Sequence, residues 1–253
     1  MSSTKEDGHV SGHRSRPARP HTGVTADGRR LREVLSYSRR GSRLNARQEA
    51  AWSRWRGTRW IPDEDVDRDD FDLRSYFGRE APLVVEIGSG VGEATVALAA
   101  ARPAYDVLAV EVWHPGVADT LHRLEQAGVD NVRLLSVDAV WTLGHLVGPD
   151  SLAELWTFFP DPWPKKRHHR RRLVDRDFAR LAASRLRPGA LWRLATDWPD
   201  YAEQMIEVLE AEPLVENVHE GPAPRWPDRP LTRFERRGLD AGRSVTDLTF
   251  RRV

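Results

Sequence analysis

The sequence predicts an α/β protein built on a mostly parallel, doubly wound, Rossmann-like sheet. Short apolar runs alternate with helical stretches of 10–15 residues, which is the pattern of such a sheet. A glycine-rich segment follows the first apolar run at residues 86–92, and 253 residues suffice for one large α/β domain. Ligands of these sheets bind beyond the carboxyl ends of the strands, so functional residues are expected there.

The composition excludes several classes of protein. An apolar fraction of 40% and ten Trp can build a sizeable core, and the absence of cysteine rules out disulfides and thiolate metal sites. No apolar run approaches the roughly 20 residues that a membrane span needs. The basic N-terminus also lacks the apolar stretch of a signal peptide. We therefore expect a cytoplasmic protein with no bound metal and no membrane partner.

The net charge of +1 hides a segregation of charges along the chain. The first third is rich in Arg, and so is the stretch 165–172, which suits a protein that binds a polyanion at one face. Lysine occurs only at positions 5, 165 and 166, and two of these are adjacent. Either a compact ammonium group is needed at 165–166 or the pairing is chance.

The chain divides into a tail and one domain. Residues 1–30 are rich in Ser, Gly, Pro, His and Arg, and predict a disordered basic tail. Residues 31–253 form the predicted domain, in which residues 46–56 have the spacing of a short amphipathic helix and residues 61–72 predict an acidic loop.

The remaining elements follow from apolar patterning, and no internal repeat is present. Strands are predicted at 83–87, 107–111, 132–137, 152–159, 190–195 and 246–252. Helices are predicted at 93–102, 117–126 and 175–186, and around Tyr201, Met205, Val208 and Leu209. Pro188 and Gly189 are expected to turn the chain into the fifth strand.

The glycine-rich loop after the first strand argues for a ligand without phosphates. Its glycines, Gly88, Gly90 and Gly92, have the spacing G-x-G-x-G, whereas the dinucleotide fingerprint is G-x-G-x-x-G. Glu93 follows at the start of a helix, where its carboxylate would repel a pyrophosphate. The spacing and this charge disfavour a nicotinamide cofactor.

Acidic residues at three successive strand ends fit S-adenosylmethionine. Glu86 can face the cationic methionine part, and Glu111 lies about 20 residues beyond the loop, where a carboxylate can accept both ribose hydroxyls. Asp138, with Ala139, can accept from the adenine amino group. One such acid could simply be solvated, but three in succession after a glycine-rich loop favour the cofactor.

The stretch 158–173 carries the predicted chemistry. Asp161 lies between two prolines that stiffen the loop, directly after the fourth strand. Aromatic rings stand beside a dense cationic run, which is typical of proteins that stack a base and grip phosphates. A solvated basic face is the alternative, but its position at a strand end favours RNA contact by Lys165 and by Arg167, His168, His169, Arg170, Arg171 and Arg172.

Six segments of the sequence resemble the bacterial tRNA (guanine-N7-)-methyltransferase family. They are EIGSGVG (86–92), AVEVWHPGV (109–117), VDAVWTL (137–143), FPDPWPKKRHHRRRL (159–173), ATDWPDY (195–201) and TRFERRG (232–238). They occur in the family's order, and the resemblance as a whole covers the chain from roughly residue 30 to its end. The resemblance implies a class I S-adenosylmethionine-dependent methyltransferase that methylates N7 of guanine 46 in the tRNA variable loop.

The resemblance also implies roles for individual residues. It assigns Glu86, Glu111, Asp138 and Asp161 to the methyl donor, with Asp161 also catalytic. It assigns to the substrate Lys165, Asp197, Thr232, Arg233, Phe234 and Glu235. Pro164, His169 and Arg233 depart from the family's more usual residues, which leaves the individual RNA contacts open.

Methylation of N7 makes particular demands on the site. Guanine N7 has a free lone pair and no proton to lose, so no general base is obligatory, and positioning and electrostatics should dominate. A carboxylate can accept from both donors of the guanine Watson–Crick edge, and Asp161, Asp197 and Glu235 are the candidates. Asp197 could instead cap a helix, and Glu235 could instead pair with an arginine.

Three other functions stay open on the sequence. The chain could methylate a different atom of RNA, or be a non-catalytic RNA-binding module that kept the fold. A nicotinamide oxidoreductase is disfavoured by the loop spacing. A monomer and a homodimer are both compatible with the sequence.

Overall fold

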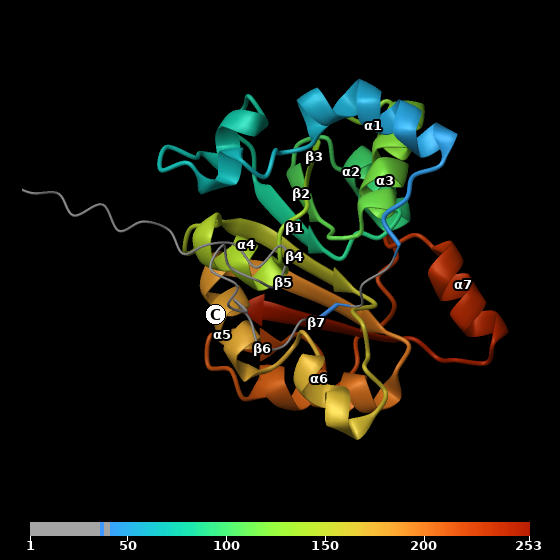
Figure 1. The fold of residues 1–253 in the computed structure, drawn as a ribbon. Helices are drawn as coiled ribbons and strands as arrows, with labels where there is room; N and C mark the ends of the chain where they lie inside the picture. The colour runs from blue at the N-terminus through green and yellow to red at the C-terminus, as the bar shows by residue number, and fades with distance from the viewer. Residues whose placement is uncertain (1–35, 38–40) are drawn as a thin grey trace, which may run out of the picture.

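A seven-stranded mixed sheet lies at the centre of the computed structural model, which describes residues 36–37 and 41–253 (Figure 1). The predicted tail at residues 1–30 lies outside the described residues. The strand order is β3-β2-β1-β4-β5-β7-β6. The strands are β1 (Leu83–Ile87), β2 (Asp106–Val110), β3 (Val132–Leu135), β4 (Leu152–Phe158), β5 (Leu186–Thr196), β6 (Val215–Asn217) and β7 (Thr246–Arg252).

The sheet is mostly parallel and doubly wound, as predicted. Strands β1 to β5 pair in parallel, whereas β7 pairs antiparallel with both β5 and β6. In this register Ile87 pairs with Val110 on one side and with Thr157 on the other. Strands β1, β2 and β4 therefore end together, and the residues that follow them meet at one edge of the sheet.

Helices cover both faces of the sheet (Figure 1). On one face lie α1 (Ala46–Arg59), α2 (Glu93–Ala101) and α3 (His114–Ala127), and on the other lie α4 (Ala139–His145), α5 (Arg176–Arg185) and α6 (Pro199–Glu210). Each face has its own apolar core, with Leu121 and Trp156 in one and Phe178 and Met205 in the other. None of the described helices is long and apolar enough to cross a bilayer.

Helix α7 (Arg233–Asp240) stands apart from both layers, at the side toward which β4 points (Figure 1). Three short 3-10 helices complete the fold: η1 (Asp65–Asp67), η2 (Leu73–Tyr76) and η3 (Lys166–Arg171). The sequence did not predict α4, α7, β6 or the 3-10 helices, because three to eight residues carry too little periodicity. The predicted loop at 61–72 contains η1.

The fifth strand differs from its prediction. Pro188 and Gly189 were expected to precede the strand, but β5 begins at Leu186 and runs through both residues. Its pairing with β4 is irregular there, because Leu152 pairs with Leu186 whereas Glu154 pairs with Leu191. The residues between Leu186 and Leu191 therefore form a bulge opposite β4, and the positive φ of 80° at Gly189 allows the backbone to bend there.

The glycine-rich loop depends on a close backbone contact with α3. A Cβ atom on Gly116 would lie 2.3 Å from the carbonyl oxygen of Gly90, and one on Gly92 would lie 2.5 Å from the Thr120 hydroxyl. Gly92 also has φ of 77°, a left-handed conformation that disfavours other residues. These glycines let the loop lie directly against the first turns of α3.

We predict that Gly116→Ala destabilises the protein, by about 1–3 kcal/mol of unfolding free energy, because the added methyl must displace the Gly90 backbone. The matched control is Gly144→Ala in α4, where an added Cβ meets nothing within 4 Å. That change should stabilise by about 0.4–1 kcal/mol. Urea unfolding followed by circular dichroism checks both, and equal effects of the two changes would contradict the contact.

Candidate active site

Glu86 and Ser89 are two buried polar residues where β1 meets the glycine-rich loop. Glu86 is 2% exposed, and its Oε2 atom has no hydrogen-bond partner among the described residues. The Ser89 hydroxyl is likewise buried without a partner there. Burial, together with the neighbouring Glu111 carboxylate, raises the pKa of Glu86 to about 7. A buried carboxylate oxygen without a partner is costly, so Glu86 suits a cationic ligand.

Glu111, which follows β2, fixes the shape of the loop. Its Oε2 accepts from the Gly90 amide at 2.7 Å, and its Oε1 accepts from the Trp113 amide at 2.7 Å. These two bonds hold the Glu111 carboxylate against the loop at the end of β2. The geometry is compatible with the predicted contact to a ribose diol.

Asp138 lies at the same edge, after β3, and caps a helix that the sequence did not predict. It is buried, and its Oδ1 accepts from the amides of Val140 (2.9 Å) and Trp141 (3.2 Å). Ala139 is the first residue of α4. The structure thus gives Asp138 a local structural role, and its contact with adenine, like that of Ala139, stays a prediction.

The loop after β4 holds Asp161 in a constrained backbone. Phe159 and Trp163, on either side of Asp161, have positive φ values of 52° and 45°, which non-glycine residues rarely adopt. The Phe159 amide is anchored to the Ala195 carbonyl of β5 at 2.7 Å. Strained backbone of this kind is typical of functional sites, and here it surrounds the predicted catalytic carboxylate.

The cationic run continues from this loop as η3. None of the η3 residues is buried, and Lys165, Arg167 and Arg170 are exposed. The Arg171 guanidinium lies 3.5 Å from the centre of the Trp163 ring, which is a cation–π contact. Loss of solvent and the neighbouring cations lower the pKa of His168, so the positive charge of η3 comes from Lys and Arg. These residues form a surface that can contact phosphates.

Arg172 is the exception, because its side chain lies inside the protein, and its predicted contact with RNA gains no support. The side chain is buried, and its guanidinium donates to the Pro162 carbonyl (2.9 Å), to Gln204 (2.7 Å) and to Asp200. Arg172 therefore ties the Asp161 loop to α6. With a further contact to His169 Nε2 at 3.2 Å, four of its five N–H donors are directed to groups within the protein.

Asp197 follows β5 and is paired with a distant arginine. Its Oδ2 accepts from Arg243 Nε at 2.7 Å, and the side chain is largely buried. The alternative interpretation as a helix cap is wrong, because the residue at the N-cap of α6 is Trp198. A Cβ on Gly238 of α7 would lie 3.3 Å from the same oxygen, so α7 packs directly on this ion pair.

Glu235 is buried and is held by two arginines, the buried Arg229 and the exposed Arg225. Its carboxylate accepts from Arg225 at 3.2 Å and from Arg229 at 2.7 Å, and Arg229 also pairs with Asp247 of β7. Glu235 and Arg229 are each 1–2% exposed. The alternative interpretation of Glu235 as an arginine partner therefore describes the structure, and this network fixes the start of α7. The predicted contact of Glu235 with substrate gains no support.

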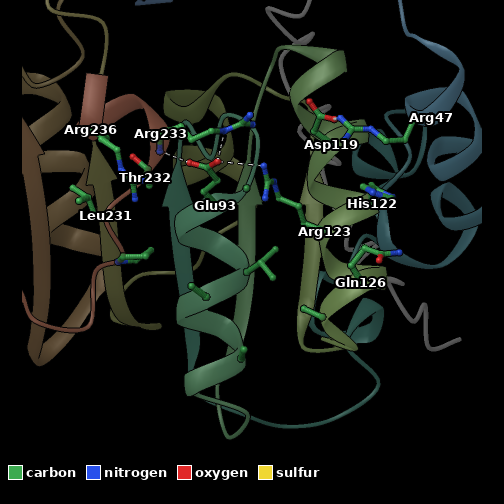
Figure 2. Close-up of a pocket in the computed structure, with 16 residues that line it drawn as sticks. Arg47, Glu93, Asp119, His122, Arg123, Gln126, Leu231, Thr232, Arg233 and Arg236 are labelled. Atoms are coloured by element: carbon green, nitrogen blue, oxygen red, sulfur yellow. Dashed lines mark hydrogen bonds and ion pairs between the residues drawn. The ribbon is translucent and has the colours of Figure 1, made fainter. Parts of the chain in front are cut away.

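The start of α7 is joined through Glu93 to the glycine-rich loop at residues 86–92, the predicted donor loop. Thr232 caps α7 and accepts from the Glu235 amide, and the Arg233 amide (2.6 Å) and Nε (2.7 Å) both donate to Glu93. Arg123 of α3 also reaches Glu93, at 3.2 Å, as Figure 2 shows. Burial would raise the pKa of Glu93, but these arginines lower it, so Glu93 is ionised and already neutralised.

Phe234 offers an exposed ring beside the Asp161 loop. Its side chain is 51% exposed, yet its ring centre lies 5.2 Å from that of Phe159. An exposed aromatic ring held by a second ring can stack on a base. The structure thus brings Phe234 together with the predicted catalytic loop.

Sequence reasoning missed two tryptophan contacts at this edge. Trp113 Nε1 donates to the Gly41 carbonyl at 2.8 Å, and Trp163 Nε1 donates to the Ser36 carbonyl at 3.0 Å. Residues close before α1 therefore touch the loops after β2 and after β4. Within the described residues, no group of three or more His, Cys, Asp or Glu could hold a metal ion.

Sequence comparison gives relatives of nearly the same length. The family described as "Putative methyltransferase" matches residues 80–248. A tRNA (guanine-N(7)-)-methyltransferase of Nocardioides sp. is 65% identical over 94% of this chain and 94% of its own. The enzyme of that name from Cutibacterium acnes is 52% identical over 91% of this chain and 88% of its own, and that from Bordetella pertussis is 46% identical over 87% and 85%.

The chain belongs to the tRNA (guanine-N(7)-)-methyltransferase family. Solved structures of more distant methyltransferases share its fold. A 16S rRNA (adenine(1408)-N(1))-methyltransferase from Catenulisporales acidiphilia superimposes with a TM-score of 0.51 at 17% identity, covering 73% of this chain and 92% of its own. The 16S rRNA methyltransferase KamB superimposes with a TM-score of 0.50 at 17% identity, covering 87% and 99%. The class I S-adenosylmethionine-dependent methyltransferase fold is thereby confirmed.

We predict that a rise in pH lowers the stability of this protein and raises its affinity for the methyl donor, because both depend on the ionisation of Glu86. Without donor, the raised pKa of Glu86 contributes about 3 kcal/mol of stability below pH 4.5, and this is lost as pH rises toward 7. Donor affinity should instead rise from pH 5.5 to 7.5, because a cationic ligand prefers the ionised carboxylate. Calorimetric titration with S-adenosylmethionine and chemical unfolding at each pH measure the two.

The control for this prediction is Glu86→Gln, which keeps the shape and removes the titration. Its donor affinity should be low and nearly flat over that pH range, and its stability should lose the corresponding pH dependence. A pH dependence of donor binding as steep in the variant as in the native chain would rule out Glu86 as the responsible group.

We predict that Arg172→Lys lowers the rate of methyl transfer at saturating tRNA and donor by tenfold or more. Lysine keeps the charge but cannot reach Pro162, Gln204 and Asp200 together, and misplacing reacting groups by about 1 Å can cost on the order of a hundredfold. The salt dependence of tRNA binding should stay native. Arg170→Ala, in the exposed run, should flatten that log–log slope by about one unit. If Arg172→Lys instead flattened the salt dependence of tRNA binding and left the rate native, Arg172 would be an RNA contact.

Proposed function

We propose that this chain transfers a methyl group from S-adenosylmethionine to N7 of guanine 46 in the variable loop of tRNA. The observation that carries the proposal is the position of the Asp161 loop, which follows β4 between the acid-lined ends of β1 and β2 and the exposed cations of η3. That arrangement suits a cationic donor on one side and a polyanionic substrate on the other. The names of relatives up to 65% identical support the choice of tRNA and of guanine N7.

The residues present fit S-adenosylmethionine. The buried Glu86 Oε2 lacks a partner among the described residues, and the Glu111 carboxylate lies against the glycine-rich loop, which suits the cationic end and the ribose of this donor. Gly88, Gly90 and Gly92 all have positive φ, so the loop has no side chains where a ligand must approach the backbone. When bound, the donor supplies an electrophilic methyl group on a sulfonium.

The chain's own contribution is positioning and charge. Asp161 would accept from the Watson–Crick edge of guanine and leave N7 aimed at the methyl group. Because positive charge moves from sulfonium to purine, a nearby carboxylate stabilises the transition state, and no residue needs to remove a proton. Phe234 is available to stack on the base, and Lys165 with the exposed cations of η3 would hold flanking phosphates.

The setting of the proposed reaction follows from its substrate. A tRNA substrate places the enzyme in the cytoplasm, and the reaction uses neither a metal nor a membrane. Residues 31–253 would act as one catalytic domain. A monomer and a homodimer are both compatible with the site, since all the residues named for the site belong to one chain.

The proposal predicts one product and one essential carboxylate. Incubation with unmodified tRNA and labelled donor should give 7-methylguanosine, which nucleoside analysis and mapping of the labelled position should place at 46. Asp161→Asn should lower the single-turnover rate at saturating tRNA and donor by about a hundredfold, the scale of losing one preorganised electrostatic group. The matched control is Asp177→Asn, an exposed carboxylate in the first turn of α5.

The product analysis and the rate of Asp161→Asn test two different claims. Methylation at another atom or nucleotide would overturn the proposed function. The correct product with a native rate in Asp161→Asn would keep the function and remove the catalytic role of Asp161. The control should match the native chain in both measurements.

A further inference from the structure

A groove of about 660 Å³ runs along the outer surface of α2 and α3 and is bounded by the segment 230–236 (Figure 2). Its upper end lies at Gly92 and Glu93, beside the donor loop, and at Thr232. From there it follows the helices away from the sheet edge. The apolar side chains of α2 that line it are small, namely Val96, Ala97 and Ala100, which leaves the groove open for a ligand.

Cationic side chains from three separate parts of the chain line this α2–α3 groove. Arg47 comes from α1, Arg123 from α3, and Arg233 and Arg236 from the first turn of α7. His122 adds an imidazole between them. Figure 2 shows these residues around one hollow, although they lie up to 189 positions apart in the chain, from residue 47 to residue 236.

The acidic residues of the groove are already neutralised. Glu93 accepts from Arg123 and Arg233, and Asp119 accepts from Arg47 at 2.6 Å and from Gln48. Four guanidinium groups thus face two carboxylates, an excess of two positive charges before His122 is counted. Arg236 has no ion pair with any described residue.

The arginines retain donors for a ligand. The Arg47 and Arg233 side chains are 57% and 67% exposed. Each guanidinium carries five N–H groups, and the bonds to the carboxylates use only one or two of them. Guanidinium groups with free donors are well suited to phosphate oxygens.

We propose that the α2–α3 groove binds the phosphodiester backbone of the tRNA substrate outside the site of methyl transfer. The inference rests on the proposed function, since it takes tRNA as the ligand. The groove begins where the donor loop and Thr232 meet, so a strand that presents its guanine at the sheet edge can continue into it. It lies on the α1–α3 side of the sheet, whereas η3 follows β4 and is anchored to α6, which covers the other side. The two basic surfaces would hold the RNA on both sides of the target base.

The charge of the groove favours RNA over a protein occupant. A second copy of this chain would have to bring an acidic surface that matches the groove. The two carboxylates of the groove itself, Glu93 and Asp119, are already paired with its arginines and leave an excess of positive charge. An RNA backbone brings one negative charge per nucleotide and needs only fixed cations and steric room. Both are present.

The first test removes two cations from the groove. The double variant Arg47→Gln with Arg236→Gln should weaken binding of unmodified tRNA on the order of tenfold or more at low salt. The log–log salt dependence should flatten by about two units, one for each phosphate that is no longer neutralised. The control, Arg180→Gln with Arg187→Gln, removes two exposed arginines from α5 and β5 and leaves the overall charge equal.

The possible outcomes separate the inference from the function on which it rests. If the native chain fails to bind tRNA, the proposed function is wrong. If it binds tRNA but the groove variant keeps the affinity and the salt slope of the control, the inference is wrong. A groove variant that binds tRNA normally but changes its sedimentation would identify the groove as an interface between copies of this chain instead. Thermal unfolding of both variants establishes that they are folded.

The second test detects contact between RNA and the groove by crosslinking at a single introduced thiol. Because the chain contains no cysteine, Gln126→Cys places a single thiol in the groove for a photoreactive crosslinker. Illumination of the tRNA complex should attach RNA at this position, and Arg180→Cys on α5 should give none. Equal yields at both positions, or none at 126 while tRNA is bound, would overturn the inference.

Discussion

The parallel alignment of β1, β2, β3 and β4 is the constraint on which the site depends. Because these strands run in the same direction and their carboxyl ends are aligned, the residues at and after each strand end arrive at the same edge of the sheet. Glu86, Glu111, Asp138 and Asp161 are far apart in the sequence, yet no long-range contact among their side chains is needed to gather them. The sheet's backbone hydrogen bonds do so, and the loops adjust only the final orientation.

Glu93 connects the glycine-rich loop to the start of α7. A carboxylate in the first turn of α2 interacts favourably with the positive end of the helix, and here it also accepts the backbone amide and guanidinium of Arg233. Glu93, whose charge argues against a pyrophosphate ligand in the sequence, therefore holds the start of α7, which carries residues predicted to contact substrate. Together with the buried Glu235–Arg229–Asp247 network, it fixes α7 beside the donor loop. Breaking one partner of such a buried network typically costs about 3–5 kcal/mol, so this segment is rigidly placed.

Local patterns explain what the sequence could predict. The runs at 83–87 and 107–111 are strands within one residue of their predicted bounds, because buried parallel strands are continuously apolar. Short elements such as α4 lack that signal. The sequence therefore predicted a ligand contact for Asp138 but did not predict that Asp138 caps a helix. Arg172 is indistinguishable in sequence from Arg170 and Arg171, and only the fold buries it. The bond between Glu93 and Arg233 spans 140 residues and leaves no local trace.

The use of arginine across the molecule has one physical explanation. Arg172 and Arg229 are buried, and each binds three or more acceptors or rings from separate elements, which a planar guanidinium with five donors can do and an ammonium cannot. The same property lets Arg123 and Arg233 share Glu93 and still face the groove with donors to spare. Lys165, in contrast, is exposed at the N-cap of η3 and behaves as a point charge. Arginine thus serves both in the internal anchors and on the exposed basic surfaces, because a guanidinium that is bound to one carboxylate still has donors for a further acceptor.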